Sequence, residues 1–399
     1  MDFPIPAGCL AVTERLASRG YSAYLVGGCV RDLCRGVEPH DYDLTTSATP
    51  DEMKRALTGF RVIETGIAHG TLTVLSDGRP YEVTTYRVDG DYSDGRHPDG
   101  VVFTASLEED LRRRDFTVNA MAYSRADGLI DPFGGQADLS ARLIRAVGDP
   151  DRRFTEDSLR VLRALRFSST LGFSIEPNTA AALFRLAPSV RRVSPERIRE
   201  ELLKLLSGKA SGSVLQTYRD VLFAAVPALA PLGDGWDNAA SAASRLSSDP
   251  PLALAALARP LGADATAALF RSLRTDRKSE RRASAAVAAY AAGLPADLSC
   301  AGLFLVDFGA AVARDAVALA RAYRDPGAEA GESAVAAFIE SGRPATLADL
   351  AVRGNDLVAV PAGPARKEAL DALLRLAASG KVDNEREALL ARLKAGKPE

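Results

Sequence analysis

The sequence predicts an α+β protein, with a mixed sheet at the front of the chain followed by helices to its end. Short apolar runs with strand character alternate with turns and helical segments in the first 140 residues. From about residue 153 apolar residues recur at helical spacing, and beyond 211 the chain is alanine-rich and punctuated by Pro and Gly. With 399 residues the chain is long enough for two to four domains. We therefore expect a sheet domain over 1–140 and helical domains over 141–210 and 211–399.

Four segments of the first region are typical of strands: "SAYLVGG" (22–28), "DYDLTT" (41–46), "GTLTVLS" (70–76) and "YEVTTYR" (81–87). Helical patterns precede or separate them at residues 8–19 and 50–58. The loop "DGDYSDGRHPDG" (89–100) is rich in Asp, Gly and Pro and has almost no apolar content, so we expect it to be mobile.

Two helices are predicted in the second region. "EDSLRVLRALRFSSTLGF" (156–173) places apolar residues and arginines at helical spacing. "SPERIREELLKLLSG" (194–208) has Ser194 as a cap, Pro195 in the first turn and Gly208 at its end.

The charge is unevenly distributed although the whole chain carries a formal net charge of only −2. Residues 1–139 hold 14 Lys/Arg against 22 Asp/Glu, a net charge of −8, and residues 140–210 hold 14 against 8, a net charge of +6. A basic middle beside an acidic front suits a negatively charged ligand held near a carboxylate-bound metal. Ordinary solvated faces explain the same distribution.

The cysteines and the amino terminus indicate a reduced, intracellular protein. Cys9, Cys29, Cys34 and Cys300 show neither CxxC spacing nor a disulfide framework. The first 20 residues lack the basic region and apolar core of a signal peptide, and no apolar run reaches the ~18 residues of a membrane helix. We expect a cytoplasmic location and no membrane partner.

The segment "YLVGGCVRDLCRGVEPHDYDLTT" (24–46) contains the first candidate site. Side chains two apart on a strand share a face, so Asp41 and Asp43 present two carboxylates together while Tyr42 points away. Like charges so close raise each other's pKa unless a cation lies between them, and Mg²⁺ prefers carboxylate oxygen. Alone, a DxD pair is equally explained by a solvated turn.

A glycine turn upstream strengthens the interpretation. Gly27 and Gly28 follow an apolar strand and precede a helical segment, where backbone N–H groups can approach phosphate oxygens, and Arg31 lies one helical turn later. Glycine turn, arginine and carboxylate pair fall within seventeen residues. Together they predict a nucleotide and metal site.

"EDSLR" supplies a candidate for choosing a base. Asp157 and Arg160 are three apart on the predicted helix and therefore neighbours on its surface. Asp157 only accepts hydrogen bonds and Arg160 only donates them, which matches the amine and the unprotonated ring nitrogen of cytosine or adenine. Uracil and guanine present the opposite order and leave both groups mismatched, at about 1–3 kcal/mol each. A surface ion pair is the alternative.

The motifs resemble a known family. "LVGGCVRDLCRG" with "HDYDLTT", "RRRDFTVNAMAY" (112–123), "DPFGGQADL" (131–139), "EDSLRVLRALRFSSTLGF" and "ERIREELLKLL" (196–206) occur in the order seen in tRNA nucleotidyltransferases and bacterial poly(A) polymerases, within the DNA polymerase β superfamily. The resemblance covers roughly the first 210 residues.

The resemblance implies a nucleotidyltransferase head at 1–140, a base-selecting neck at 141–210 and a tRNA-binding body and tail at 211–399. It implies roles for the following residues: Asp41 and Asp43 as catalytic metal ligands; Gly28, Arg31 and Arg114 as triphosphate contacts; Asp157, Arg160, Arg163 and Arg166 as nucleotide contacts. Glu82 is a candidate third carboxylate, or an exposed strand residue. Because Arg166 lies nine residues from Asp157, nearly opposite on an ideal helix, it is better placed for phosphate or RNA than for the base.

The implied reaction is the addition of CCA to the 3′ end of tRNA from CTP and ATP, with Mg²⁺ and release of pyrophosphate. "TGIAHGTLTV" (65–74) resembles the CCA-adding pattern, and "DPFGG" offers either a hinge or a plain turn. A-adding or CC-adding enzymes, a poly(A) polymerase, and a catalytically silent RNA-binding protein remain alternatives. Only His40, His69 and His97 are present, so the later chain holds no histidine-dependent phosphohydrolase domain.

Overall fold

The computed structural model describes residues 3–89 and 101–395, which form two compact units. Unit 1 contains Met1–Glu201 and Asp220–Pro227, and unit 2 contains Leu202–Arg219 and Ala228–Glu399. The loop for which the sequence predicts mobility lies outside the described residues from Gly90 to Gly100, and His97 with it.

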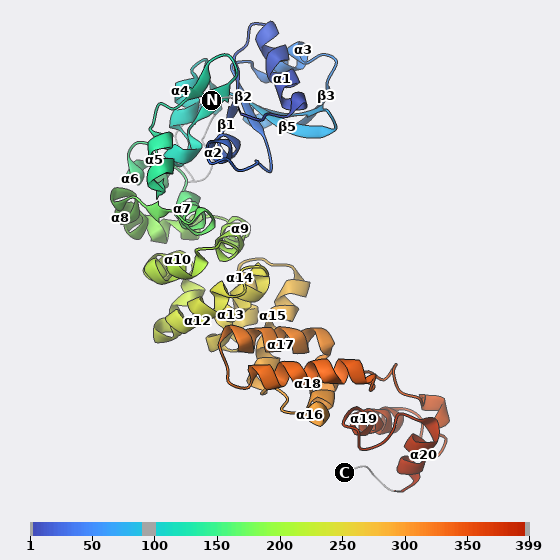
Figure 1. Cartoon of the computed structure of the whole chain (residues 1–399). Coiled ribbons are helices and arrows are strands. Elements are labelled where there is room, and N and C mark those ends of the chain that lie inside the picture. The colour runs from blue at the N-terminus through green and yellow to red at the C-terminus, as the bar shows by residue number, and fades with distance from the viewer. Residues whose placement is uncertain (1–2, 90–100, 396–399) are drawn as a thin grey trace. The chain divides into compact units, whose positions relative to one another are not determined.

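Unit 1 begins with a seven-stranded mixed sheet in the order β3-β4-β5-β2-β1-β8-β9 (Figure 1). Its strands are β1 (Ala23–Val26), β2 (Asp43–Thr46), β3 (Arg61–Gly66), β4 (Thr71–Ser76), β5 (Arg79–Thr85), β8 (Ala122–Ser124) and β9 (Gly128–Ile130). β2 and β5 pair in parallel, whereas the other neighbours are antiparallel. The mixed sheet confirms the predicted fold class. A separate hairpin joins β6 (Arg87–Asp89) to β7 (Val101–Phe103).

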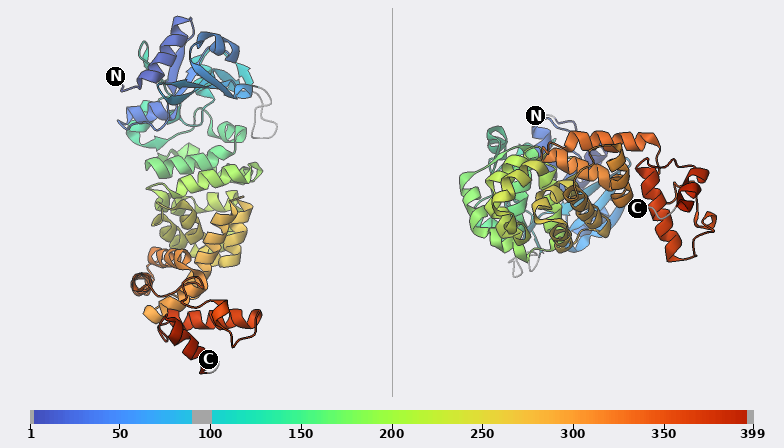
Figure 2. Two further views of the ribbon diagram at one scale, coloured as in Figure 1. Left: turned by 90° about the vertical axis from the view of Figure 1, so that its right-hand side faces the viewer. Right: turned by 90° about the horizontal axis from the view of Figure 1, so that it is seen from below.

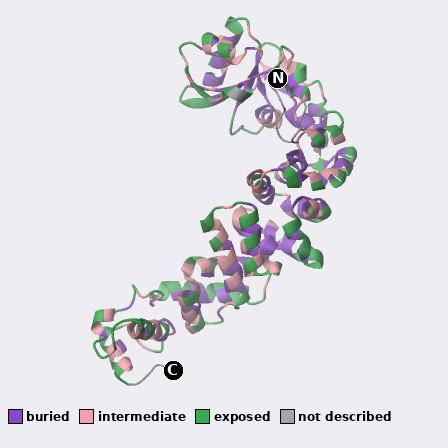
Figure 3. Cartoon of the chain, turned by 180° about the vertical axis from the view of Figure 1, so that it is seen from behind, coloured by how far each residue is buried: buried purple, intermediate pink, exposed green. Residues whose placement is uncertain are grey.

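Helices pack against this sheet and close its core. They are α1 (Ala7–Ser18), α2 (Gly28–Cys34), α3 (Pro50–Ala56), α4 (Leu107–Arg112) and α5 (Gly135–Ala141). Val12 and Leu16 of α1 are buried with Leu25, Leu44 and Val83 of the strands, and part of the sheet is purple in Figure 3. The four predicted strands overlap β1, β2, β4 and β5, whereas β3, β8 and β9 were not predicted.

The rest of unit 1 is helical except for one small sheet. Its helices are α6 (Pro150–Glu156), α7 (Leu159–Leu171), α8 (Pro177–Leu186), α9 (Pro195–Leu206) and α11 (Arg219–Ala225), with α9 continuing into unit 2. The all-helical expectation for 141–210 is wrong at one point, because β10 (Leu143–Ile144) and β11 (Ser174–Ile175) pair in parallel. The chain turns at Gly172, whose φ is +70°, and Ser174 N then donates to Arg142 O.

Unit 2 is built from helices, coloured yellow-green to red in Figure 2. They are α10 (Ser211–Thr217), α12 (Trp236–Ser244), α13 (Pro250–Ala258), α14 (Ala263–Ser272), α15 (Arg277–Ala291), α16 (Leu298–Phe308), α17 (Ala310–Ala322), α18 (Ala328–Ser341), α19 (Pro364–Ala378) and α20 (Arg386–Lys394). Trp236 is fully buried and donates its indole N–H to Leu215 O at 3.0 Å. Within the described ranges, no helix has both the length and the apolar character required to traverse a bilayer.

Candidate active site

The carboxylate pair stands where β2 begins. Asp41 and Asp43 are exposed, whereas Tyr42 between them is buried, as expected for an extended segment. Asp43 is the register partner of Glu82 in the parallel pairing of β2 with β5, so the two carboxylates stand side by side on one face of the sheet. The structure therefore brings Glu82 to the predicted pair.

These carboxylates repel one another in the absence of a cation. Although one side of Asp43 is open to solvent, the surrounding protein atoms partly desolvate its carboxylate and raise its pKa. The charges of Glu82 and Asp41 raise this pKa further, and the Arg114 guanidinium opposes them. Asp41 also pairs with His40, Oδ2 to Nδ1 at 3.0 Å, but both side chains are highly exposed and the pair contributes little.

The donor set fits a hard divalent cation. All its ligands are carboxylate oxygens, which Mg²⁺ prefers, and a cation would relieve the repulsion that raises the pKa of Asp43. Across 3–89 and 101–395 no three His, Cys, Asp or Glu side chains already form a cage for a metal ion.

Two arginines converge on the glycine turn between β1 and α2. Gly27 has φ +79° and ψ −131°, a conformation that favours glycine, and a Cβ built there would lie 3.1 Å from Nη1 of Arg114. A Cβ built on Gly28 would lie 3.6 Å from Nη2 of Arg31. The three predicted triphosphate contacts, Gly28, Arg31 and Arg114, are thus gathered in one place.

Both guanidiniums are held from behind by carboxylates. Arg31 donates from Nε and Nη2 to Asp32 at 3.0 and 2.8 Å, and from Nη1 to Asn119 Oδ1 at 2.8 Å. Arg114 donates from Nη2 to the fully buried Asp110 at 3.1 Å. Its Nε is buried and has no hydrogen-bond partner among the residues that the structure describes, so Arg114 keeps a donor for a further acceptor.

The base-selecting pair is arranged differently from the expectation. Asp157 lies in extended conformation between α6 and α7, not on the helix with Arg160, because its Oδ1 accepts from Leu159 N at 3.1 Å and begins α7. Its Oδ2 pairs with Arg197 of α9 at 3.1 Å. The predicted i,i+3 arrangement on one helix is therefore wrong, although Asp157 and Arg160 remain close in sequence at the start of α7.

Arg160 is buried and anchored by three acceptors. Nη1 donates to Arg153 O and to Glu156 Oε2, each at 3.0 Å, and Nη2 donates to Arg113 O at 2.9 Å. Nε makes no hydrogen bond within the described part of the chain. Arg160 thereby ties α7 to the "RRRDF" segment while retaining donors for a base.

Arg163 and Arg166 lie against Phe167 with Arg31. Their guanidinium carbons lie 5.5, 3.9 and 5.4 Å from the ring centroid, respectively. Arg166 Nε pairs with Glu201 of α9 at 2.8 Å, and Arg163 Nε and Nη2 donate to Asp115 Oδ2 at 2.8 and 2.6 Å. Although burial alone would raise the pKa of Asp115, Arg163 and Asn119 hold it well below its usual range.

Sequence reasoning missed several residues of this network. Asp115 and Asn119 stand within the quoted "RRRDFTVNAMAY", and Asn119 joins Arg31 to Asp115 through its two amide atoms. Glu156 holds Arg160, and Arg197 holds Asp157. A buried polar pair inside an otherwise apolar segment was the available signal for Asp115 and Asn119, whereas nothing local marks Arg197.

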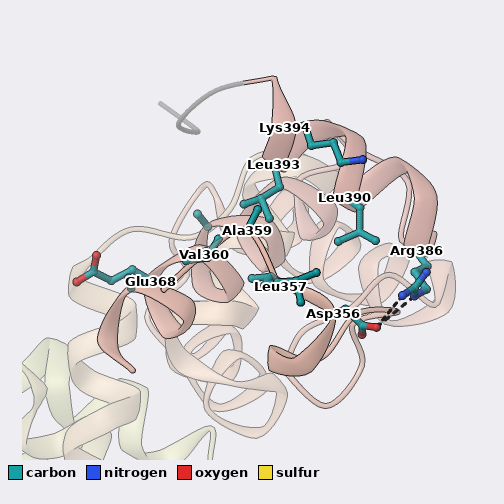
Figure 4. Close-up of a pocket in the computed structure, with 13 residues that line it drawn as sticks. Asp356, Leu357, Ala359, Val360, Glu368, Arg386, Leu390, Leu393 and Lys394 are labelled. Carbon is teal, nitrogen blue, oxygen red and sulfur yellow. Dashed lines mark hydrogen bonds and ion pairs between the residues drawn. The ribbon is translucent and has the colours of Figure 1, made fainter. Parts of the chain in front are cut away.

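An apolar cavity in unit 2 is unrelated to these residues (Figure 4). It has a volume of about 610 Å³ and lies between α19, α20 and the segment 356–360, lined mainly by Leu357, Val360, Leu390 and Leu393. The ion pair of Asp356 with Arg386 at 2.9 Å stands at one side. Most of its lining is apolar, so the carboxylate and arginine site of unit 1 is the candidate active site.

Three family models match successive parts of the chain. The poly A polymerase head domain matches residues 23–145, the probable RNA and SrmB-binding site of polymerase A matches 172–230, and the putative tRNA nucleotidyltransferase domain 2 matches 250–393.

Curated relatives match over nearly the whole length. A CCA-adding enzyme of Geobacillus thermodenitrificans is 39% identical over 390 residues, 96% of this chain and 95% of the relative. A CCA-adding enzyme of Limosilactobacillus fermentum is 37% identical over 387 residues, 95% and 94% of the two chains. The crystal structure of the Bacillus stearothermophilus CCA-adding enzyme in complex with CTP matches with a TM-score of 0.79 and 34% identity, covering 97% of both chains.

Proposed function

We propose that this chain, which belongs to the CCA-adding enzyme family, adds C, C and A to the 3′ end of tRNA from CTP and ATP and releases pyrophosphate. The observation that carries the proposal is the parallel register of β2 with β5, which sets Asp43 beside Glu82 next to a glycine turn flanked by Arg31 and Arg114. A phosphate-binding turn and a carboxylate group at one edge of the sheet are what nucleotidyl transfer needs.

In unit 1, we assign metal binding to carboxylates and triphosphate binding to arginines. Asp41 and Asp43, with Glu82 as the third carboxylate, would hold Mg²⁺, which supplies Lewis-acid activation of the tRNA hydroxyl and charge neutralisation on the phosphates when bound. Arg31 and Arg114 hold the triphosphate at the Gly28 turn and balance the charge that develops as pyrophosphate leaves. No covalent intermediate with the protein is required.

Asp157 and Arg160 select the base. Asp157 already accepts one N–H and one guanidinium, and its carboxylate retains lone pairs for the amine of cytosine or adenine. Arg160 retains Nε–H for the adjacent ring nitrogen. Arg163 and Arg166, held by Asp115 and Glu201, support the neck behind this pair.

The division of labour along the chain follows from these roles. Residues 1–140 form the catalytic head, 141–210 the base-selecting neck, and 211–399 the body and tail that bind tRNA through its shape and backbone. A protein that matures tRNA belongs in the cytoplasm, where its RNA and nucleotide substrates are found.

The test is incubation of the pure protein with tRNA lacking its CCA end, Mg²⁺ and each labelled nucleotide, separately and together. CCA addition requires two C residues and then one A, with no U or G. A alone on tRNA ending in CC, C alone, or long A tails on any RNA would each replace the proposal with the corresponding enzyme of the family. No incorporation from any nucleotide would indicate a silent RNA-binding protein.

A further inference from the structure

Several Lys and Arg residues at the junction of α14 and α15 in unit 2 are exposed. Figure 1 shows the two helices. The exposed members are Arg271, Arg274, Arg277, Lys278 and Arg281. Residues 271–282 contain six Lys/Arg and two Asp/Glu, a net charge of +4, whereas residues 211–399 as a whole contain 22 of each. The remainder of 211–399 therefore carries a net charge of −4, and positive charge is concentrated at this one corner.

Some cations of this segment form ion pairs and others do not. Arg282 turns inward and is neutralised by Asp315 at 2.7 Å and by Asp249 at 2.6 Å. Arg271 pairs with Glu280 at 2.6 Å and fixes the end of α14 against α15. In contrast, Arg277, Lys278 and Arg281 form no ion pair with any residue in the described part of the chain. We name these three residues the α15 basic corner.

Their position is unfavourable for the helix itself. α15 begins at Arg277, behind Asp276, whose side chain caps the helix by accepting from Ser279 N at 2.9 Å. Cations in the first turn oppose the positive end of the helix dipole. Arg277 and Arg281 also repel each other, because residues four apart are neighbours on a helix surface. The acidic residues at this helix start, Asp276 and Glu280, offset the cost only in part, because Glu280 is already paired with Arg271.

We infer that the α15 basic corner binds the sugar–phosphate backbone of tRNA, an inference that rests on the proposed function. Anionic phosphates supply the missing counter-charge, and Lys and Arg side chains are the usual phosphate contacts in nucleic-acid complexes. Residues 271–282 contain no Phe, Tyr or Trp on which a base would stack. The corner consequently recognises backbone and not sequence.

The test compares tRNA binding by the wild type and by the Arg277→Gln, Lys278→Gln, Arg281→Gln triple variant, with tRNA lacking CCA, over a range of salt concentrations. We expect Kd to rise about tenfold or more at low salt, and the slope of log K against log salt to become shallower by about 2–3. The matched control, Arg314→Gln, Lys381→Gln, Lys394→Gln, removes the same charge from exposed but dispersed positions of unit 2. This control should change the Kd for tRNA, and the slope of log K against log salt, much less than the triple variant does.

Thermal unfolding separates binding from a structural role. Because the corner opposes the helix dipole, the triple variant should unfold at the same or a higher temperature, while its CTP binding stays at the wild-type level. Unchanged tRNA affinity and salt slope, or an equal loss in the dispersed control, would overturn the inference. Direct tRNA binding does not depend on nucleotide addition. If the wild type binds tRNA but adds no nucleotide, and the triple variant still binds tRNA more weakly, only the proposed function is refuted.

Discussion

At the scale of single residues, Asp43 carries an electrostatic penalty that only a ligand relieves. Partial desolvation and the charge of Glu82 raise its pKa above the ordinary value of 3.8, so the folded protein binds this proton more tightly than the unfolded chain. In the metal-free protein, the free energy of unfolding therefore falls as pH rises from the pKa of Asp43 in the unfolded chain to its higher pKa in the folded protein.

We therefore predict that Asp43→Asn raises the free energy of unfolding of the metal-free protein at pH 7, by about 0.2–1 kcal/mol, because it removes a like-charge pair across two strands. Urea unfolding in the presence of a chelator measures the difference. The control is Asp51→Asn, at an exposed carboxylate in the first turn of α3. A variant less stable than the wild type would show that Asp43 is stabilised within the protein alone.

The pKa of Asp115 is shifted in the opposite direction to that of Asp43. Arg163 holds its pKa far below that of an unfolded aspartate, so its contribution is fully present above about pH 4 and is lost as pH falls toward the folded pKa. Asp115→Asn should cost about 2–4 kcal/mol at pH 7, because it leaves Arg163 with a neutral partner. The same substitution should cost much less at pH 3, and an equal cost at both pH values would contradict the assigned ion pair.

The residues that the sequence predicted are those whose partners are near in the chain. Asp41, Asp43, Gly28 and Arg31 lie within the consecutive elements β1, α2 and β2, where short spacing along the chain limits their relation. Glu82 was only a candidate, because the register of β2 with β5 joins residues 39 apart and no local pattern fixes it. Arg31 with Asn119 and Asp115 with Arg163 are separated by 88 and 48 residues, and long-range pairs of this kind depend on the finished fold.

At the scale of elements, the segment between α6 and α7 is held by α9. The apolar spacing of 156–173 predicted a helix correctly, but its start was placed too early, because an aspartate at a helix start serves equally as a cap or as a first-turn residue. Asp157 lies one residue before Ser158, where α7 is capped, and is therefore off the helix surface. Its orientation then depends on Arg197, which comes from an element 40 residues away.

Arg197→Ala should loosen Asp157 and thereby weaken base selection. We expect KM for CTP and ATP to rise about 5- to 150-fold, the equivalent of about 1–3 kcal/mol for a lost charged hydrogen bond. The preference for C and A over U and G should fall as well, and Arg197→Lys should restore part of it. Steady-state kinetics with each nucleotide test this, with Arg192→Ala at an exposed position as the control. Unchanged discrimination would remove Arg197 from the site.

At the scale of the whole molecule, unit 1 was far more predictable than unit 2. Motif order and strand alternation specify the sheet and the helices behind it, whereas the alanine-rich chain beyond 211 indicates only helices. In α13, every residue from Leu252 to Ala258 is buried, so no polar face marks its orientation. Small side chains pack closely from any side, and their partners cannot be assigned from periodicity.

The proposed reaction depends most on Asp41 and Asp43 holding a divalent ion at the triphosphate. The most direct measurement is single-turnover incorporation of CMP into tRNA lacking CCA, at saturating CTP and Mg²⁺, by the wild type and by Asp43→Asn. We expect the variant to incorporate CMP at least about 10³-fold more slowly than the wild type, because several kcal/mol of transition-state stabilisation are lost, while it still binds tRNA. Incorporation by Asp43→Asn at the wild-type rate would contradict this expectation.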